Sequence, residues 1–158
     1  MLLLRQRTAP TDPAVSGDLR VPARIARVID GDTVELSDGT RVRLLGIDAP
    51  ELARGSSTAE SGAEESKRWL RERVSGAPVE LRYGSERLDK YGRTLAWIYL
   101  ADDTLLNEVL LLEGQAKLVT SFGLPLDLSD RLHVAAAQAR VQRRGLWSAA
   151  PPSGRKNE

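Results

Sequence analysis

Five segments of this chain predict β-strands, either because hydrophobic and polar residues alternate in them or because they are short apolar or β-branched runs. The segments cover residues 23–29, 33–36, 40–44, 79–83 and 95–100. Asp38 and Gly39 separate the second segment from the third. An Asp-Gly pair between two alternating runs is typical of a hairpin whose two turn residues adopt positive φ. We therefore expect the first three strands to form an antiparallel meander.

Apolar residues at helical spacing predict three helices. Their expected spans are 61–76, 104–113 and 129–145. Ser61 and Glu64 have the spacing of a capping box, which indicates that the first helix begins there. Ser129 or Asp130 is expected to cap the third helix. The buried stripe of the first helix is predicted to contain Ala63, Ser66, Leu70 and Val74.

Five strands with a helix between the third and fourth, followed by two more helices, fit an α+β fold that is mainly β. The expected architecture is a five-stranded Greek-key barrel of the OB type with three helices. Residues 1–20 and 149–158 contain Pro, Ser and Gly without apolar periodicity, so we expect a flexible arm and a flexible tail. The chain has 158 residues, and the folded domain is expected at 21–148.

Composition excludes several classes of site. The chain has no cysteine and one histidine, His133, so disulfides, thiolate sites and histidine-rich zinc sites are excluded. We expect His133 to be structural or exposed. The net charge is only +1, so any positive charge for a nucleic-acid partner must be local.

No apolar run approaches the roughly 20 residues that span a bilayer, so no membrane span is expected. The start, Met1 to Arg5, is too short for the core of a signal peptide. Export is suspected only from the habits of the family discussed below, and the location stays open. Nothing in the sequence indicates an oligomer interface, so we expect a monomer.

Two aspartates are candidates for binding a hard cation. Asp32 and Asp48 each follow an apolar strand, where a carboxylate is badly placed unless something compensates its charge. Calcium takes oxygen ligands from carboxylates, backbone carbonyls and water. The alternative is that Asp30 and Asp32 form an ordinary Asp-Gly-Asp turn and that Asp48 ends a strand before Pro50.

Arg43, Arg93 and Glu51 are the candidates for phosphate chemistry. Hydrolysis of a phosphodiester builds charge on oxygens that a guanidinium fork can meet at two points. Glu51 follows Pro50 on a stiffened loop, where it can take a proton from an attacking water. Each residue has an alternative interpretation without chemistry. Arg43 can belong to a solvated basic face shared with Arg41, Arg93 can be a surface charge at the rim of the barrel, and Glu51 can be an ordinary surface residue.

With these residues assembled, the chain resembles the staphylococcal-type nuclease (thermonuclease) family. The resemblance covers residues 23–148, and each motif is weak by itself. Together, six motifs that occur in the order and at the spacing of the family are specific for it. They lie at 28–34, 43–51, 89–93, 106–108, 114–117 and 145–148.

The resemblance implies an OB-fold endonuclease that cleaves DNA and RNA with Ca²⁺, with little sugar preference, and leaves 3′-phosphates. It implies that Asp32, Asp48 and the carbonyl of Ala49 bind the metal. It also implies that Glu51 is the general base and that Arg43 and Arg93 hold the phosphate. Lys90 and Tyr91 match residues beside the bound nucleotide.

One departure concerns base stacking. Thr120 and Phe122 stand where the best-known member of the family has two tyrosines. Phe122 keeps an aromatic ring for stacking on a base, whereas Thr120 has none. The sequence therefore predicts Phe122 as a substrate-binding residue. The alternative to an enzyme is a non-catalytic OB-fold module that binds nucleic acid or protein.

Overall fold

The computed structural model describes residues 19–148, and its centre is a closed five-stranded barrel in the order β1-β2-β3-β6-β5. The strands are β1 (Arg20–Asp30), β2 (Thr33–Leu36), β3 (Arg41–Leu44), β5 (Pro78–Leu88) and β6 (Thr94–Leu100). All neighbours pair antiparallel except β3 and β6, which run parallel and close the barrel. The predicted α+β barrel and its meander are confirmed.

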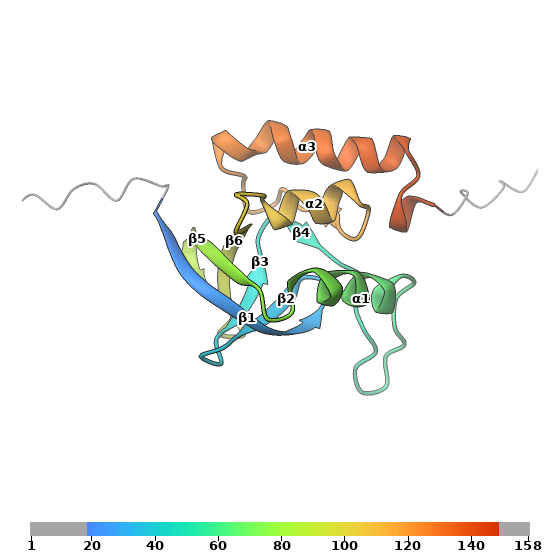
Figure 1. The fold of residues 1–158 in the computed structure, drawn as a ribbon. Helices are drawn as coiled ribbons and strands as arrows, with labels where there is room; N and C mark the ends of the chain where they lie inside the picture. The colour runs from blue at the N-terminus through green and yellow to red at the C-terminus, as the bar shows by residue number, and fades with distance from the viewer. Residues whose placement is uncertain (1–18, 149–158) are drawn as a thin grey trace, which may run out of the picture.

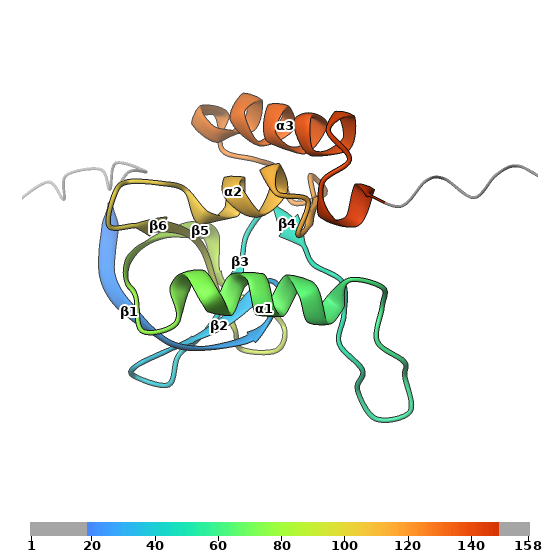
Figure 2. The same ribbon diagram turned by 45° about the vertical axis from the view of Figure 1, so that its right-hand side comes forward.

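Three helices and a small second sheet lie outside the barrel, with the second and third helices above it and the first beside β1 (Figures 1 and 2). The helices are α1 (Ala63–Val74), α2 (Leu106–Leu112) and α3 (Leu126–Val141), followed by the 3₁₀ helix η1 (Gly145–Trp147). The strands β4 (Ile47–Asp48) and β7 (Lys117–Leu118) pair with each other. In both views α2 lies between the barrel and α3, while α1 packs along β1.

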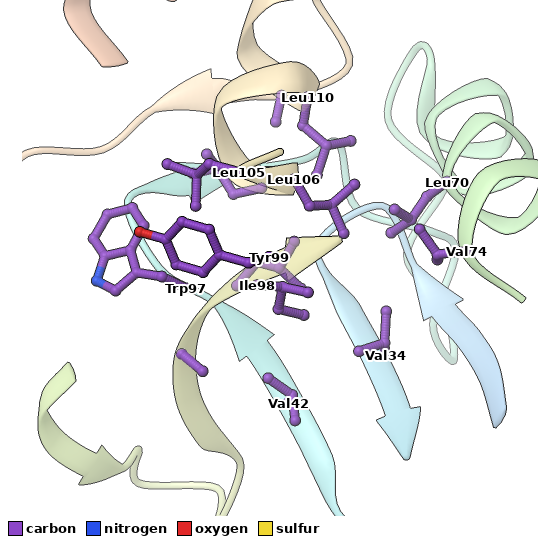
Figure 3. Close-up of a cluster of buried hydrophobic side chains, with 14 of the residues drawn as sticks. Val34, Val42, Leu70, Val74, Trp97, Ile98, Tyr99, Leu105, Leu106 and Leu110 are labelled. Carbon is purple, nitrogen blue, oxygen red and sulfur yellow. The ribbon is translucent and has the colours of Figure 1, made fainter. Parts of the chain in front are cut away.

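The core fills the barrel and the space beneath α1 and α2 (Figure 3). Val42 and Leu44 point inward from β3, and Leu70 and Leu110 reach the same cluster from α1 and α2. Burying a side chain of this kind contributes about 1.5–3 kcal/mol. The polar residues that alternate with them, such as Arg41, therefore lie on the outer face.

The hairpin between β2 and β3 forms where the sequence predicts it, but its turn differs. Within this turn only Gly39 has a positive φ, at 85°, so the expectation that both turn residues have positive φ is wrong. Leu36 and Thr40 close a three-residue loop, and Asp38 accepts a hydrogen bond from the Thr40 amide at 2.9 Å. A longer loop needs only one left-handed residue because its first part is an ordinary turn.

The predicted capping box of the first helix is wrong. The residue before α1 is Gly62, at φ 84°, and no side chain caps the helix. Glycine adopts this left-handed conformation at little cost, so the chain enters the helix without help from Ser61. The predicted buried stripe, Ala63, Ser66, Leu70 and Val74, is confirmed.

The third helix starts earlier than predicted. It begins at Leu126 after Pro125, and the Ser129 amide already donates to the Pro125 carbonyl at 2.9 Å. Neither Ser129 nor Asp130 is therefore the cap. Asp127 lies in the first turn, where a carboxylate suits the positive helix end, and Arg82 on β5 donates to it.

The predicted arm at 1–20 and tail at 149–158 lie outside the described residues, apart from Leu19 and Arg20. Arg20 already belongs to β1, so the folded part begins one residue before the expected position. Within residues 19–148, no helix is long and apolar enough to span a bilayer.

Asn107 on α2 is a buried polar link between the helix and the barrel. Its side-chain oxygen accepts from the Ile98 amide at 3.0 Å, and its nitrogen donates to the Leu45 carbonyl at 2.8 Å. The side chain is buried, so neither backbone group has ready access to water in its absence.

We predict that Asn107→Ala lowers the free energy of unfolding by roughly 2–4 kcal/mol, because each buried group left without a partner costs about 1–3 kcal/mol. Urea denaturation measures the change. Gln138→Ala, on the exposed face of α3, is the control and should alter stability by less than about 0.5 kcal/mol. Equal stability of the two variants would show that Asn107 is not a structural link.

Candidate functional site

The site forms where the turn between β1 and β2 packs against the end of β4. Gly31 makes this contact possible, because a Cβ there would lie 2.3 Å from Ser66 Oγ and 2.6 Å from Ala49 Cβ. No larger residue fits in that space. Asp32 consequently lies beside Ala49, although 17 residues separate them in sequence.

Asp32 and Asp48 converge on one guanidinium group. Arg43 Nη2 lies 3.1 Å from an Asp32 carboxylate oxygen and 3.2 Å from an Asp48 carboxylate oxygen. Arg43 Nη1 also donates to the Leu44 carbonyl at 2.6 Å and to the Ile47 carbonyl at 2.8 Å. These backbone contacts fix the guanidinium at the end of β3, between the two aspartates.

Asp32 is the buried member of the pair. Its carboxylate accepts from the Ala49 amide at 2.9 Å and from the Thr33 hydroxyl at 3.1 Å. Burial raises its pKa to about 6, although Arg43 and the Ala49 amide lower it. The nearby Asp30 carboxylate raises it further. Desolvation therefore outweighs the attraction of Arg43, which only partly offsets the cost of burying this carboxylate.

Arg93 approaches the same place from the turn between β5 and β6. Its Nη1 donates to the Thr33 hydroxyl at 3.4 Å, and Thr33 in turn contacts Asp32. Asp89 holds the turn by accepting from the Arg93 side chain at 2.7 Å and from two backbone amides at 2.9 Å. Burial raises the pKa of Asp89, but these hydrogen bonds more than offset it and leave the pKa below its ordinary value.

Lys90 and Tyr91 lie at the exposed tip of this turn, next to Arg93. The Lys90 ammonium is 5.0 Å from the centre of the Tyr91 ring, and the Arg93 guanidinium is 5.4 Å from it. The structure thus places a cationic and aromatic rim beside Arg93.

Glu51 lies two residues beyond Ala49, at the start of a loop that projects from the body of the protein (Figure 2). Its amide donates to the Glu60 side chain at 3.0 Å, and its carbonyl accepts from the Glu60 amide at 2.8 Å. The Glu51 side chain is exposed, and within residues 19–148 its carboxylate makes no hydrogen bond or ion pair. The carboxylate is therefore open to water.

The sequence did not point to the residue that holds this loop. Arg54 pairs with Asp30 at 3.0 Å, and Asp30 also accepts from the Asp32 amide at 3.2 Å. In the described part of the chain, this is the one hydrogen bond or ion pair that joins residues 52–59 to the rest of the protein. Asp30 could be noticed in the Asp-Gly-Asp turn, whereas Arg54 carries no local signal. Thr33 and Asp89 were missed as well.

Phe122 is not part of this cluster. Its side chain is 88% exposed, in the turn between β7 and α3. The structure therefore does not pack it against the aspartates or the arginines. His133 is exposed on α3, where Nδ1 contacts the Ser129 carbonyl at 2.9 Å, as expected for a residue outside the site.

A metal ion at this position would need ligands beyond the acidic side chains. In residues 19–148, no group of three His, Cys, Asp or Glu side chains could hold a metal ion. Two carboxylates do converge, and Asp48 is 57% exposed and so reachable from solvent. The donor set fits a hard cation that completes its shell with a backbone carbonyl, water and substrate oxygens.

Comparison with known proteins identifies the family of this chain. A family model described as staphylococcal nuclease homologue matches residues 41–149. The chain is 31% identical over 129 residues to a thermonuclease of Staphylococcus hyicus, covering 79% of this chain and 75% of the relative. It is 35% identical over 125 residues to a thermonuclease of Staphylococcus intermedius, covering 77% and 72%. Endonuclease YncB of Bacillus subtilis (strain 168) is 30% identical over 132 residues, covering 81% and 62%.

The chain belongs to the staphylococcal nuclease family. The resemblance found in the sequence is thereby confirmed, and so is the enzyme class, a nuclease of the thermonuclease and endonuclease family. The roles of individual residues in this nuclease stay predictions, which the geometry above supports to different degrees.

The raised pKa of Asp32 predicts how the stability of the metal-free nuclease depends on pH. Between pH 4 and 6 the folded protein holds a proton on Asp32 that the unfolded chain has lost, so the unfolding free energy falls as pH rises. Asp32→Asn removes this cost of up to about 3 kcal/mol. Its stability relative to the parent protein, measured by denaturation in EDTA, should therefore increase from pH 4 to pH 7.

Asp38→Asn is the control, with the opposite sign. The Thr40 amide lowers the pKa of Asp38, so this carboxylate stabilises the fold above its unfolded pKa and the stabilisation is lost as pH falls. The asparagine variant should lose stability relative to the parent protein as pH rises. A pH-independent difference for Asp32→Asn would contradict the assigned burial of Asp32.

A second prediction concerns the Arg54–Asp30 contact. Arg54→Gln should make residues 52–59 several-fold more sensitive to a broad-specificity protease, because the loop loses its ion pair to the body. Arg54→Lys should restore part of the resistance. In an Asp30→Asn background, Arg54→Gln should have little further effect. Equal cleavage of the parent protein and Arg54→Gln would show that the pair does not order the loop.

Proposed function

We propose that this protein is a calcium-dependent endonuclease that hydrolyses DNA and RNA with little sugar preference and leaves 3′-phosphates. The observation that carries the proposal is the convergence of Asp32 and Asp48 on Arg43, at 3.1 and 3.2 Å. Arg93 reaches the same cluster through Thr33. A divalent cation would supply positive charge for the two aspartates, and the phosphates of a nucleic acid would supply negative charge for the two arginines.

Asp32, Asp48 and the backbone carbonyl of Ala49 are the residues that would hold Ca²⁺. Such an ion, when bound, supplies positive charge next to the scissile phosphate and lowers the pKa of a bound water, which makes the water a better nucleophile. Only two acidic side chains contribute, so the substrate phosphate and water would provide the remaining oxygens.

Arg43 and Arg93 would hold the phosphate. Their planar guanidinium groups present several N–H donors, which match phosphate oxygens at two points. Arg43 is fixed by two backbone carbonyls and Arg93 by Asp89, so both cations are oriented before the substrate arrives. Preoriented charge of this kind stabilises the additional negative charge of the transition state.

Glu51 would orient or deprotonate the water that attacks the phosphorus in line. Its carboxylate is exposed and lacks a partner among the described residues, as a proton acceptor for solvent requires. The Glu60 and Arg54 contacts hold the segment that carries it. As the water oxygen bonds to phosphorus, the bond from phosphorus to the 5′-oxygen breaks. The 5′-oxygen takes a proton from solvent and leaves as a hydroxyl, and the phosphate stays on the 3′ side.

The rim supplies the proposed contacts to the nucleotide. Lys90 and Tyr91 stand beside Arg93, and the exposed ring of Phe122 offers a stacking surface farther along the chain. All of these groups come from residues 21–148 of one chain, so we propose that this segment is the nuclease domain and that it acts as a monomer.

We predict that Glu51→Gln, Arg43→Ala and Arg93→Ala each lower the rate of plasmid and RNA digestion by about 10²–10⁴. Each removes one group that the transition state needs. Arg43→Lys keeps the charge but loses the two-point contact, so it should recover only part of the activity. Glu64→Gln, a charge change in the exposed first turn of α1, is the control and should retain full activity.

The digestion assay is run with Ca²⁺, with Mg²⁺ and with EGTA, and circular dichroism verifies that each variant is folded. Full activity in EGTA would contradict the proposed metal. Salt-dependent binding of DNA without cleavage in millimolar Ca²⁺ would instead indicate a binding module.

A further inference from the structure

The outer face of the barrel carries a second basic row beside Arg43. Arg41 pairs in register with Glu35 on β2, and Glu35 pairs with Arg27 on β1. Arg43 pairs with Thr33 in the neighbouring row. Strand residues two apart share a face, so Arg41 lies on the same outer face as Arg43, about 6.8 Å farther along β3.

The two arginines of this row share one carboxylate. Arg27 donates twice to Glu35, at 2.8 and 3.0 Å, whereas Arg41 is 3.7 Å from the same group. The hydrogen bond from Arg27 lowers the pKa of Glu35, so the carboxylate is charged at neutral pH. The row therefore has a net positive charge of one.

Both guanidinium groups are open to solvent. The side chains of Arg27 and Arg41 are 62% and 61% exposed, while that of Glu35 is 19% exposed. Exposed ion pairs of this kind are weak and are screened by salt. A phosphate can therefore replace the carboxylate as the partner of either arginine, with the same two-point geometry.

The spacing suits a nucleic-acid backbone. Phosphates of a stacked strand follow one another at about 3.4 Å along its axis, so a group about 6.8 Å from Arg43 is within reach of a phosphate near the scissile one. Arg27 extends the row by two strand spacings across the barrel, each about 4.8 Å. The row thus continues the phosphate-binding surface away from the site.

We propose that Arg41 and Arg27 bind backbone phosphates that flank the cleaved one, so that the substrate strand runs from Arg43 across the outer face of β3, β2 and β1. This inference rests on the proposed function, because it starts from a phosphate at Arg43. Glu35 acts as an internal competitor that the substrate displaces.

Salt dependence of binding tests the proposal directly. Affinity for a labelled single-stranded 20-mer is measured by fluorescence anisotropy in Ca²⁺, between about 50 and 200 mM KCl. The Glu51→Gln background is used, because it is expected to cleave about 10²–10⁴ times more slowly. Each phosphate contact contributes about 0.7 to the slope of log affinity against log salt for a single strand. Arg41→Gln should reduce the slope by about 0.7, and Arg27→Gln with Arg41→Gln by about 1.4.

Glu35→Gln gives the opposite result. It removes the competitor and leaves both arginines, so binding at low salt should become several-fold tighter. Arg143→Gln, which removes one positive charge beyond the end of α3, is the matched control and should leave the slope unchanged. Circular dichroism and thermal melting establish that all four variants are folded.

An unchanged slope in the double arginine variant, or weaker binding by Glu35→Gln, would overturn the proposal and leave the row as a solvated ion-pair ladder. Failure of the proposed function is separate, because it appears as the absence of cleavage by the unmodified protein in Ca²⁺. A gel of the recovered 20-mer shows whether the Glu51→Gln background cleaves during the measurement. When the two arginines are replaced in a protein that keeps Glu51, the loss of cleavage rate should be larger for the 20-mer than for a dinucleotide.

Discussion

The contact of the Arg43 guanidinium with Asp32 and Asp48 is the constraint on which the rest of the site depends. The Asp32 carboxylate is buried beside a second acidic residue, Asp30, and both features make its ionised form unfavourable. The cation between them offsets part of that cost, and burial still raises the pKa of Asp32. These carboxylates are the candidates for a metal site, and the arginine between them is the proposed phosphate contact.

Barrel closure assembles this cluster. Arg43 is on β3, Asp32 lies in the turn between β1 and β2, and Arg93 precedes β6, which pairs in parallel with β3. The parallel pair places the Arg93 turn beside Thr33, so Arg93 contacts Thr33 while Arg43 contacts the adjacent Asp32. Gly31 permits the close approach of the β1–β2 turn to Ala49. The scaffold is stiff because its inner face is packed with aliphatic residues (Figure 3).

The proposed base has a different kind of support. Glu51 is on a loop outside the sheet, where a few polar contacts replace the packing that fixes the arginines. Arg54 joins this loop to Asp30, and Asp30 also contacts the Asp32 amide, so one buried carboxylate connects the loop with the metal-binding candidates. The loop and the metal-binding candidates are thereby joined in one network of charges.

The sequence by itself determined the five barrel strands, the buried stripe of the first helix and the motifs that carry Asp32, Arg43, Asp48 and Arg93. These features depend on local periodicity and residue type, which are readable along the chain. Tertiary structure decided how the first and third helices begin, since a left-handed Gly62 and Pro125 replaced the expected caps. It alone revealed Arg54, Thr33 and the row from Arg41 to Arg27. These contacts join residues brought together by strand register and loop closure, and no local pattern encodes such a pairing.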